Sequence, residues 1–182
     1  MNDLTLVKRV LNNEPGSFEV LVKNYQKLVW HIISRLVQNS EDTLELSQEV
    51  FLQVYNKLGQ YKGESQLSTW IGRIAYHFAV RFLQKKGRQL EEFYVEAEAA
   101  EDETGHSQFE DLQKQQLQKQ MQTAMRQLPV LQQTIVSLYH LEELTLSEIS
   151  EITDLPQGTI KSHLFRARKR LKQILHAKRE YL

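Results

Sequence analysis

The spacing of apolar residues restricts this chain to a helical fold. Over the first 86 residues, apolar side chains recur three and four positions apart, which is the period of an amphipathic α-helix. No segment shows the alternating apolar and polar pattern of a β-strand over a useful length. With only 3 Pro and 7 Gly in 182 residues, few positions interrupt a long helix. We therefore predict an all-α fold.

Four helices are predicted in the N-terminal half. Ser40 and Ser68 precede the third and fourth helices, and their hydroxyls are expected to cap them. A polar loop over residues 59–67 connects these two helices. The four predicted helices cover residues 3–13, 17–38, 40–58 and 69–86. Their apolar faces, expected to be buried, include Leu4, Leu11, Leu44 and Trp70.

Charge is distributed unevenly along the chain, although the formal net charge is zero. Residues 1–90 carry 12 Lys and Arg against 8 Asp and Glu. Residues 91–127 carry 3 against 9, and residues 128–182 carry 8 against 6. An acidic segment therefore separates two basic ones, and such asymmetry is more informative than the sum.

The acidic segment is predicted to divide the chain into two small helical domains. Residues 89–110 have no sustained apolar stripe and many acids, which favours a flexible linker over a solvated acidic helix. The predicted domains are residues 1–88 and 111–182. We also hypothesise that the acidic linker masks the basic domains in the free protein.

The C-terminal domain has the pattern of a helix-turn-helix. After a first helix at 129–141, Thr145 and Glu148 form a capping box that opens a helix of two turns at 146–153. A turn over 154–158 leads to a last helix at 157–176. A short helix, a tight turn and a longer helix form the unit that places its second helix in the major groove of DNA.

The last helix is suited to DNA by its charge. From Pro156 to Arg179 there are eight basic residues and no acidic one. Phosphates attract this excess through counterion release, and arginine can pair bidentately with a guanine edge. Lys161, Ser162 and Phe165 lie beside the apolar stripe and are expected to be exposed together with Arg166. The alternative interpretation is an amphipathic helix with a basic solvated face.

Several classes of protein are excluded by what the sequence lacks. Because there is no Cys, disulfides, thiolate metal sites and Cys nucleophiles are ruled out. No HExxH motif, P-loop or Gly-rich fingerprint occurs, so we expect no catalytic residues, no metal, no cofactor and no enzymatic activity. No apolar run is long enough to span a bilayer and the N-terminus is not a signal peptide, so we expect a cytoplasmic protein.

Three groups of motifs match the conserved regions of a known protein family. The segment ELSQEVFL at 45–52 resembles conserved region 2.2, and STWIGRIA at 68–75 resembles regions 2.3 and 2.4. In the C-terminal domain, LTLSEIS at 144–150 and PQGTIKSHLFRARKRL at 156–171 resemble region 4. Together these motifs resemble the sigma-70 superfamily of transcription initiation factors, specifically its extracytoplasmic-function (ECF) group. Their order and spacing agree with that family over nearly the whole chain except the linker.

The resemblance implies an alternative sigma factor that directs core RNA polymerase to promoters, in response to a stress or signal. The N-terminal domain would dock on the polymerase clamp helices and open the −10 element, and the C-terminal domain would read the −35 element and contact the flap. An anti-sigma factor is an expected further partner. The implied polymerase contacts are Glu45, Gln48 and Glu49. The implied −10 contacts are Tyr61, Lys62, Gly63, Glu64, Ser65, Arg73, His77, Arg81 and Lys85. The implied −35 contacts are Thr159, Lys161, Ser162, Phe165, Arg166, Arg168, Lys169 and Arg170.

The chain departs from the family pattern at two places. Glu45 replaces an aspartate and keeps its negative charge. Tyr76-His77 stands where the family has Arg-Asn, and an imidazole cannot reproduce the paired donor and acceptor of an amide. The second departure falls among the implied −10 contacts, because His77 is one of them.

Two other classes of function compete with the sigma factor. A transcriptional activator or response-regulator output domain would share the helix-turn-helix, but it would need a receiver or ligand-binding domain, and the N-terminal half shows no βα alternation. A helical adaptor or anti-sigma-like protein would leave the basic last helix unexplained.

Overall fold

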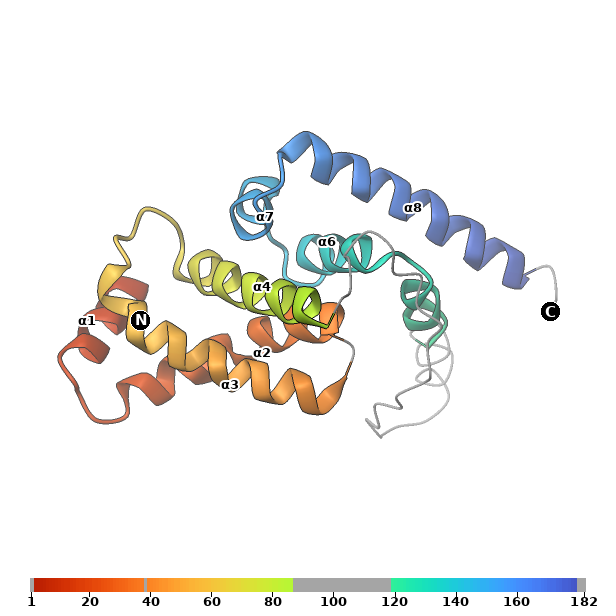
Figure 1. The fold of residues 1–182 in the computed structure, drawn as a ribbon. Helices are drawn as coiled ribbons and strands as arrows, with labels where there is room; N and C mark the ends of the chain where they lie inside the picture. The colour runs from red at the N-terminus through yellow and green to blue at the C-terminus, as the bar shows by residue number, and fades with distance from the viewer. Residues whose placement is uncertain (1, 38, 87–118, 180–182) are drawn as a thin grey trace, which may run out of the picture.

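A computed structural model describes residues 2–37, 39–86 and 119–179 of the chain (Figure 1). All regular secondary structure within these ranges is helical, which confirms the predicted all-α class. The predicted linker at 89–110 lies outside the described residues, as do the positions where the two domains were divided. In the described part of the chain, no helix is both long enough and apolar enough to cross a membrane.

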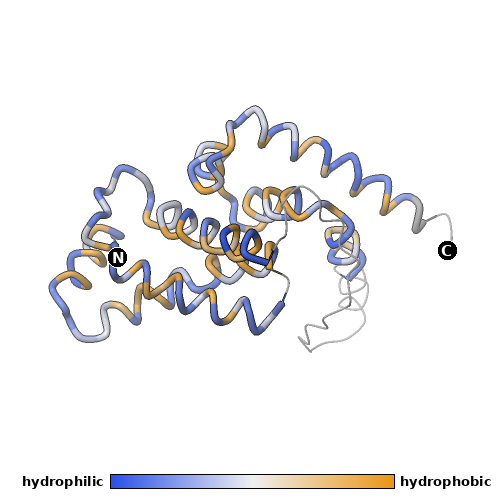
Figure 2. Tube along the Cα trace, viewed as in Figure 1, coloured by the Kyte–Doolittle hydropathy of each residue, from blue (hydrophilic) through white to orange (hydrophobic). Residues whose placement is uncertain are grey.

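The N-terminal helices are arranged around α2, which contacts α1, α3, α4 and also α6 of the C-terminal part. Leu21, Val29 and Ile33 of α2 are fully buried, because α2 carries apolar residues toward several neighbours. Figure 2 shows hydrophobic residues gathered where these helices meet. The elements are α1 (Asp3–Leu11), α2 (Ser17–Val37), α3 (Ser40–Lys57), the 3-10 turn η1 (Leu58–Gln60) and α4 (Leu67–Lys85).

The C-terminal part forms the predicted helix-turn-helix. Ile135, Ile149 and Ile160 are fully buried and join its three helices in one core. Residues 119–126 are helical and precede it. The three helices are α6 (Val130–His140), α7 (Leu146–Thr153) and α8 (Gln157–Arg179).

Local hydrogen bonds fix both ends of α7. The capping box is present as predicted: the Thr145 amide donates to Glu148 Oε2 at 2.8 Å, and the Glu148 amide donates to Thr145 Oγ1 at 3.3 Å. At the other end, Asp154 has φ +57° and terminates the helix in the left-handed region. Ser150 Oγ then donates to the Leu155 carbonyl at 2.7 Å, which closes the turn before α8.

Two predicted helix caps are wrong. Asn39 caps α3, since its side chain accepts from the Asp42 amide at 2.9 Å, and Ser40 is already the first helical residue. Gln66 occupies the N-cap of α4 without a side-chain hydrogen bond, and Ser68 lies inside the helix. In both cases the serine that was predicted to cap the helix lies where the backbone is already helical.

The predicted apolar faces are partly wrong. Leu44 points to solvent, as do Leu4 and Leu11. Leu44 and the buried Leu46 are two residues apart, which places them on opposite sides of a helix. Trp70 is half-buried and packs against the edge of the core.

The C-terminal helices lie against the N-terminal ones. Figure 1 shows α7 beside α4, and these two helices are in contact. Gly72 of α4 is buried in this contact, and a Cβ atom at its position would lie 3.0 Å from Ile152 Cδ1 of α7. The lack of a side chain at residue 72 therefore allows the two helices to approach closely.

We predict that Thr145→Ala lowers the free energy of unfolding of the C-terminal helices by about 1 kcal/mol, because the first turn of α7 loses its side-chain acceptor. Thr145→Ser keeps the hydroxyl and is expected to retain most of this stability. Urea denaturation followed by circular dichroism measures both variants. Equal midpoints for Thr145→Ala and the unmodified chain would show that the capping box contributes nothing.

Candidate nucleic-acid and polymerase interfaces

The outer face of α8 offers a compact polar and aromatic surface. Four of its residues line a shallow hollow: Lys161, Ser162, Phe165 and Arg166. All four are exposed, as the sequence predicted. The Phe165 ring is 70% exposed, which is unusual for a large apolar side chain in a monomer. Arg166 Nε donates to the Ser162 carbonyl at 3.3 Å, which orients the guanidinium along the helix. This face combines a cation, a bidentate donor and an apolar ring.

The remaining predicted −35 residues are in different environments. Arg168 turns toward α6, where its Nη2 lies 3.4 Å from His140 Nε2 and its guanidinium lies 5.7 Å from the centre of the Tyr139 ring. Arg168 therefore helps to hold α8 against α6 in this structure. Lys169 is exposed, while Thr159 and Arg170 are half-buried.

A row of basic groups follows one side of α4. Arg73, His77, Arg81 and Lys85 are spaced four residues apart, so they lie one above another on the helix. Arg81 lies over the Phe78 ring, with 5.4 Å between the guanidinium carbon and the ring centroid. Such a row of cations beside aromatic rings can bind the backbone and bases of single-stranded DNA.

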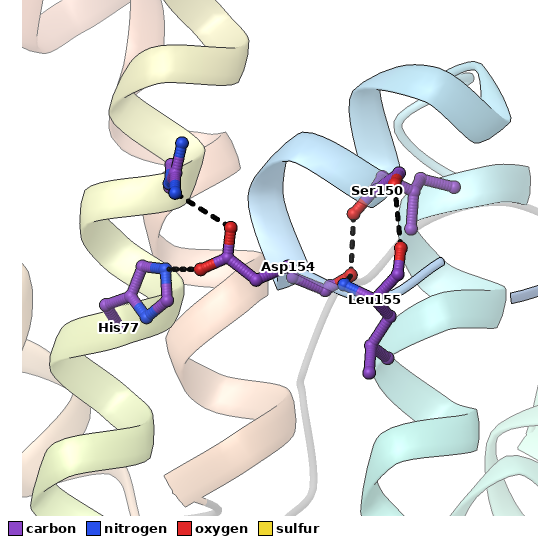
Figure 3. Close-up of polar contacts among 7 residues, drawn as sticks. His77, Ser150, Asp154 and Leu155 are labelled. Carbon is purple, nitrogen blue, oxygen red and sulfur yellow. Dashed lines mark hydrogen bonds and ion pairs between the residues drawn. The ribbon is translucent and has the colours of Figure 1, made fainter. Parts of the chain in front are cut away.

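The two N-terminal members of this row are already engaged by an acid from the C-terminal part. Arg73 Nη2 is 2.8 Å from Asp154 Oδ1, and His77 Nε2 is 2.9 Å from Asp154 Oδ2. Figure 3 shows the Asp154 carboxylate pointing from the turn after α7 toward His77 on α4. Asp154 was not among the predicted site residues. Sequence spacing gave no signal for it, because it lies 81 residues from Arg73.

Tyr76, the first residue of the Tyr76-His77 departure, belongs to the core. It is only 4% exposed, so it offers little surface to a ligand. Burial raises the pKa of Tyr76 to about 12, and the charge of Asp154 adds to this effect. The phenol is therefore neutral at ordinary pH.

The loop before α4 brings together the predicted −10 residues from Tyr61 to Ser65. Tyr61 Oη donates to the Ser65 carbonyl at 2.6 Å, which closes the loop on itself. The Tyr61 ring also packs on Trp70 with 5.5 Å between ring centroids. At its tip Gly63 has φ +74°, a conformation that L side chains rarely adopt. Lys62, Gly63 and Glu64 are exposed, and Tyr61 and Ser65 are half-buried.

The outer face of α3 carries the residues predicted for polymerase. Glu45, Gln48 and Glu49 are exposed on one side of the helix. Glu45 and Glu49 also border a hollow between α3 and α4, whose opposite wall includes Arg81 and Lys85. The predicted polymerase and −10 residues therefore meet at the rim of one hollow.

Sequence reasoning missed two apolar residues of this outer face. Leu52 is 65% exposed and Leu44 also points to solvent, and together with the intervening Gln48 they have a spacing of four residues. The two leucines add exposed apolar area to a face that also carries acids. The signal was present in the sequence, because Leu44, Gln48 and Leu52 lie opposite the buried series that begins at Leu46.

Two family models match the chain. The model described as Sigma-70 region 2 matches residues 21–89, which include most of α2 and all of α3 and α4. The model described as Sigma-70, region 4 matches residues 118–171, which include α6, α7 and much of α8. The surfaces of α3, α4 and α8 described above, and the loop before α4, all lie within these two matches.

Curated relatives match over nearly the whole chain. The RNA polymerase sigma-H factor of Pseudomonas aeruginosa is 30% identical over 180 residues, covering 95% of this chain and 93% of that protein. The ECF RNA polymerase sigma-E factor of Escherichia coli strain K12 is 31% identical over 176 residues, covering 93% of this chain and 92% of that protein.

Solved structures share the fold. The sigma factor RpoE in complex with the anti-sigma factor NepR, from Bartonella quintana, superposes with a TM-score of 0.69 at 21% identity, covering 88% of this chain and 98% of that one. CnrH in complex with the cytosolic domain of CnrY gives 0.67 at 15% identity, covering 96% and 97%. The relatives and the two region matches settle the family: the chain belongs to the ECF group of the sigma-70 family of RNA polymerase sigma factors.

Proposed function

We propose that this alternative sigma factor reads the −35 element with the outer face of α8. The observation that carries the proposal is the surface of Lys161, Ser162, Phe165 and Arg166, which is exposed on a helix held in a helix-turn-helix. Arg166 can pair with a guanine edge, and Phe165 can contact a thymine methyl group. Lys169 and Arg170 are suited to phosphates, which position the domain without reading sequence.

The −10 element is assigned to α4 and the loop before it. The basic row from Arg73 to Lys85 supplies phosphate contacts to the separated strand. The loop from Tyr61 to Ser65 would receive a base extruded from the stack, and the contacts it makes must offset the cost of unstacking.

Core RNA polymerase is assigned to the outer face of α3, with the flap contacting the C-terminal part. Glu45 and Glu49 supply negative charge, and Leu52 supplies apolar area at the centre of the surface. Interfaces commonly combine a buried apolar centre with a charged rim. We propose that nucleotide addition belongs to the core enzyme and that this chain has no catalytic role of its own.

We propose control by an anti-sigma factor, and hence a response to a signal. The support is the fold shared with RpoE, whose structure is a complex with the anti-sigma factor NepR. The site of action is then the cytoplasm, where RNA polymerase transcribes the genome.

The central experiment is transcription of fragmented genomic DNA by core polymerase with and without this protein, followed by sequencing of the transcripts. A set of start sites that depends on the added chain, with shared −35 and −10 elements, supports the proposal. A requirement for a second sigma factor would instead indicate an activator, and the proposal would fail.

We predict that Arg166→Ala weakens −35 recognition by about 1–3 kcal/mol and relaxes the base preference, since one bidentate base contact is lost. Run-off transcription from one of the promoters so identified measures the effect. Lys172→Ala is the matched control, because it removes an exposed cation of α8 away from the hollow. Equal loss in both variants, or none in either, contradicts the assignment of Arg166.

We predict that Glu49→Lys weakens binding to core polymerase at least tenfold, about 1.4 kcal/mol, because it reverses a charge of the proposed surface. Glu19→Lys on α2 makes the same charge change at an exposed position outside α3 and is expected to bind normally. Competition for core polymerase against a labelled sigma factor gives the two affinities. Unchanged binding of Glu49→Lys would place the polymerase interface elsewhere.

A further inference from the structure

The seam between α4 and α7 is closely packed. Ile152 of α7 is fully buried and faces Gly72 of α4. A Cβ at residue 72 would lie 3.0 Å from Ile152 Cδ1 and 3.3 Å from Ile32 Cδ1, so this space is already filled by side chains of both parts of the chain. The contact therefore buries apolar area, which favours association of the two parts.

Asp154 places its carboxylate over the basic row beside this seam. Its left-handed backbone ends α7 and directs the side chain away from the helix-turn-helix. The two oxygens accept from two donors one helical turn apart, Arg73 at 2.8 Å and His77 at 2.9 Å. Two oxygens of a phosphate group can accept from the same two donors.

A second polar contact joins the two parts at another point. His31 Nδ1 on α2 is paired with Glu142 Oε1 in the segment that follows α6. With the Asp154 contacts, it fixes the orientation of the C-terminal helices at two separate positions. Neither position involves residues assigned above to the −35 surface.

The apolar seam and the polar contacts together favour a closed state, in which the C-terminal helices lie against the N-terminal ones, but they are weak enough for this state to open. The Arg73 and Asp154 side chains are 53% and 48% exposed, and ion pairs at such exposure contribute little. Both sides of the apolar seam belong to one chain, and a covalent connection raises their effective concentration to about the millimolar range. A weak contact is therefore populated within the chain and can be displaced by a stronger ligand.

We propose that Asp154 is an intramolecular occupant of the −10 surface: in the free protein it takes the place of a DNA phosphate at Arg73 and His77. Promoter DNA and the closed C-terminal part then compete for the same two side chains. The inference rests on the proposed function, because it takes Arg73 and His77 as DNA contacts.

The first test measures binding of a fluorescent single-stranded DNA oligonucleotide of mixed sequence to the full chain at low salt. Asp154→Gly removes the carboxylate, and glycine tolerates the left-handed backbone. We expect about three- to tenfold tighter binding, since the affinity of a masked site is reduced by the fraction of open protein. Glu151→Gln also removes a negative charge, from an exposed position of α7, and this variant is expected to bind as the unmodified chain does.

The gain in DNA affinity from Asp154→Gly must depend on Arg73. In an Arg73→Ala background, Asp154→Gly should bring a much smaller gain, because the masked donor is missing. A gain of the same size in that background, or an equal gain from Glu151→Gln, would reflect general repulsion between acids and DNA and would overturn the inference.

The second test locks the closed state. The chain has no cysteine, so His31→Cys and Glu142→Cys introduce the only two thiols. A short cleavable crosslinker should join them within one chain and weaken oligonucleotide binding, and reductant should restore it. Failure to crosslink within the chain, or equal binding before and after reduction, overturns the inference.

The two tests separate this inference from the proposed function. Promoter-specific transcription by the unmodified chain, with no gain in DNA binding from Asp154→Gly, overturns the masking and leaves the sigma factor assignment intact. Absence of DNA binding in every variant, together with absence of promoter-specific transcription, overturns both.

Discussion

Helix α2 carries apolar side chains toward several neighbours, and the packing around it determines what the remaining helices can present to solvent. Val29 and Ile33 are fully buried, and each such side chain contributes about 1.5–3 kcal/mol on burial. Because α3 and α4 both use their inner faces against this helix, their outer faces remain available. The acids of α3 and the basic row of α4 are thus held on a fixed scaffold, with a hollow between them that each helix partly lines.

The same packing explains how a chain of zero net charge can carry a surface for DNA. Basic residues are concentrated on α4 and α8, while acids stand on α3 and in the turn after α7. Where acidic and basic residues meet between the two parts, at Asp154 and at Glu142, the partners include histidines of α4 and α2. Net charge therefore says less about nucleic-acid binding than the helix on which each charge lies.

Features with a local cause were predicted well from the sequence. The helix-turn-helix, the capping box at Thr145 and the exposed face at Phe165 depend on residues a few positions apart. The cap predicted at Ser40 was wrong because the neighbouring Asn39 is an equally good local cap, and the cap predicted at Ser68 was wrong because α4 already begins at the fully buried Leu67. The contact of Asp154 with Arg73 and His77 could not be predicted, because no periodicity relates residues so far apart.

The departure at Tyr76-His77 acquires a physical meaning from this long-range contact. With Tyr76 in the core, the surface of α4 offers Arg73, His77 and Arg81 as successive donors, so the imidazole stands within the basic row. His77 donates through a single ring nitrogen to Asp154, whereas the asparagine typical of the family would bring both a donor and an acceptor. A histidine here matches the acceptor-only carboxylate as well as the acceptor-only phosphate. The residue that departs from the family pattern is therefore compatible with both occupants of the α4 surface, and the competition between them requires that compatibility.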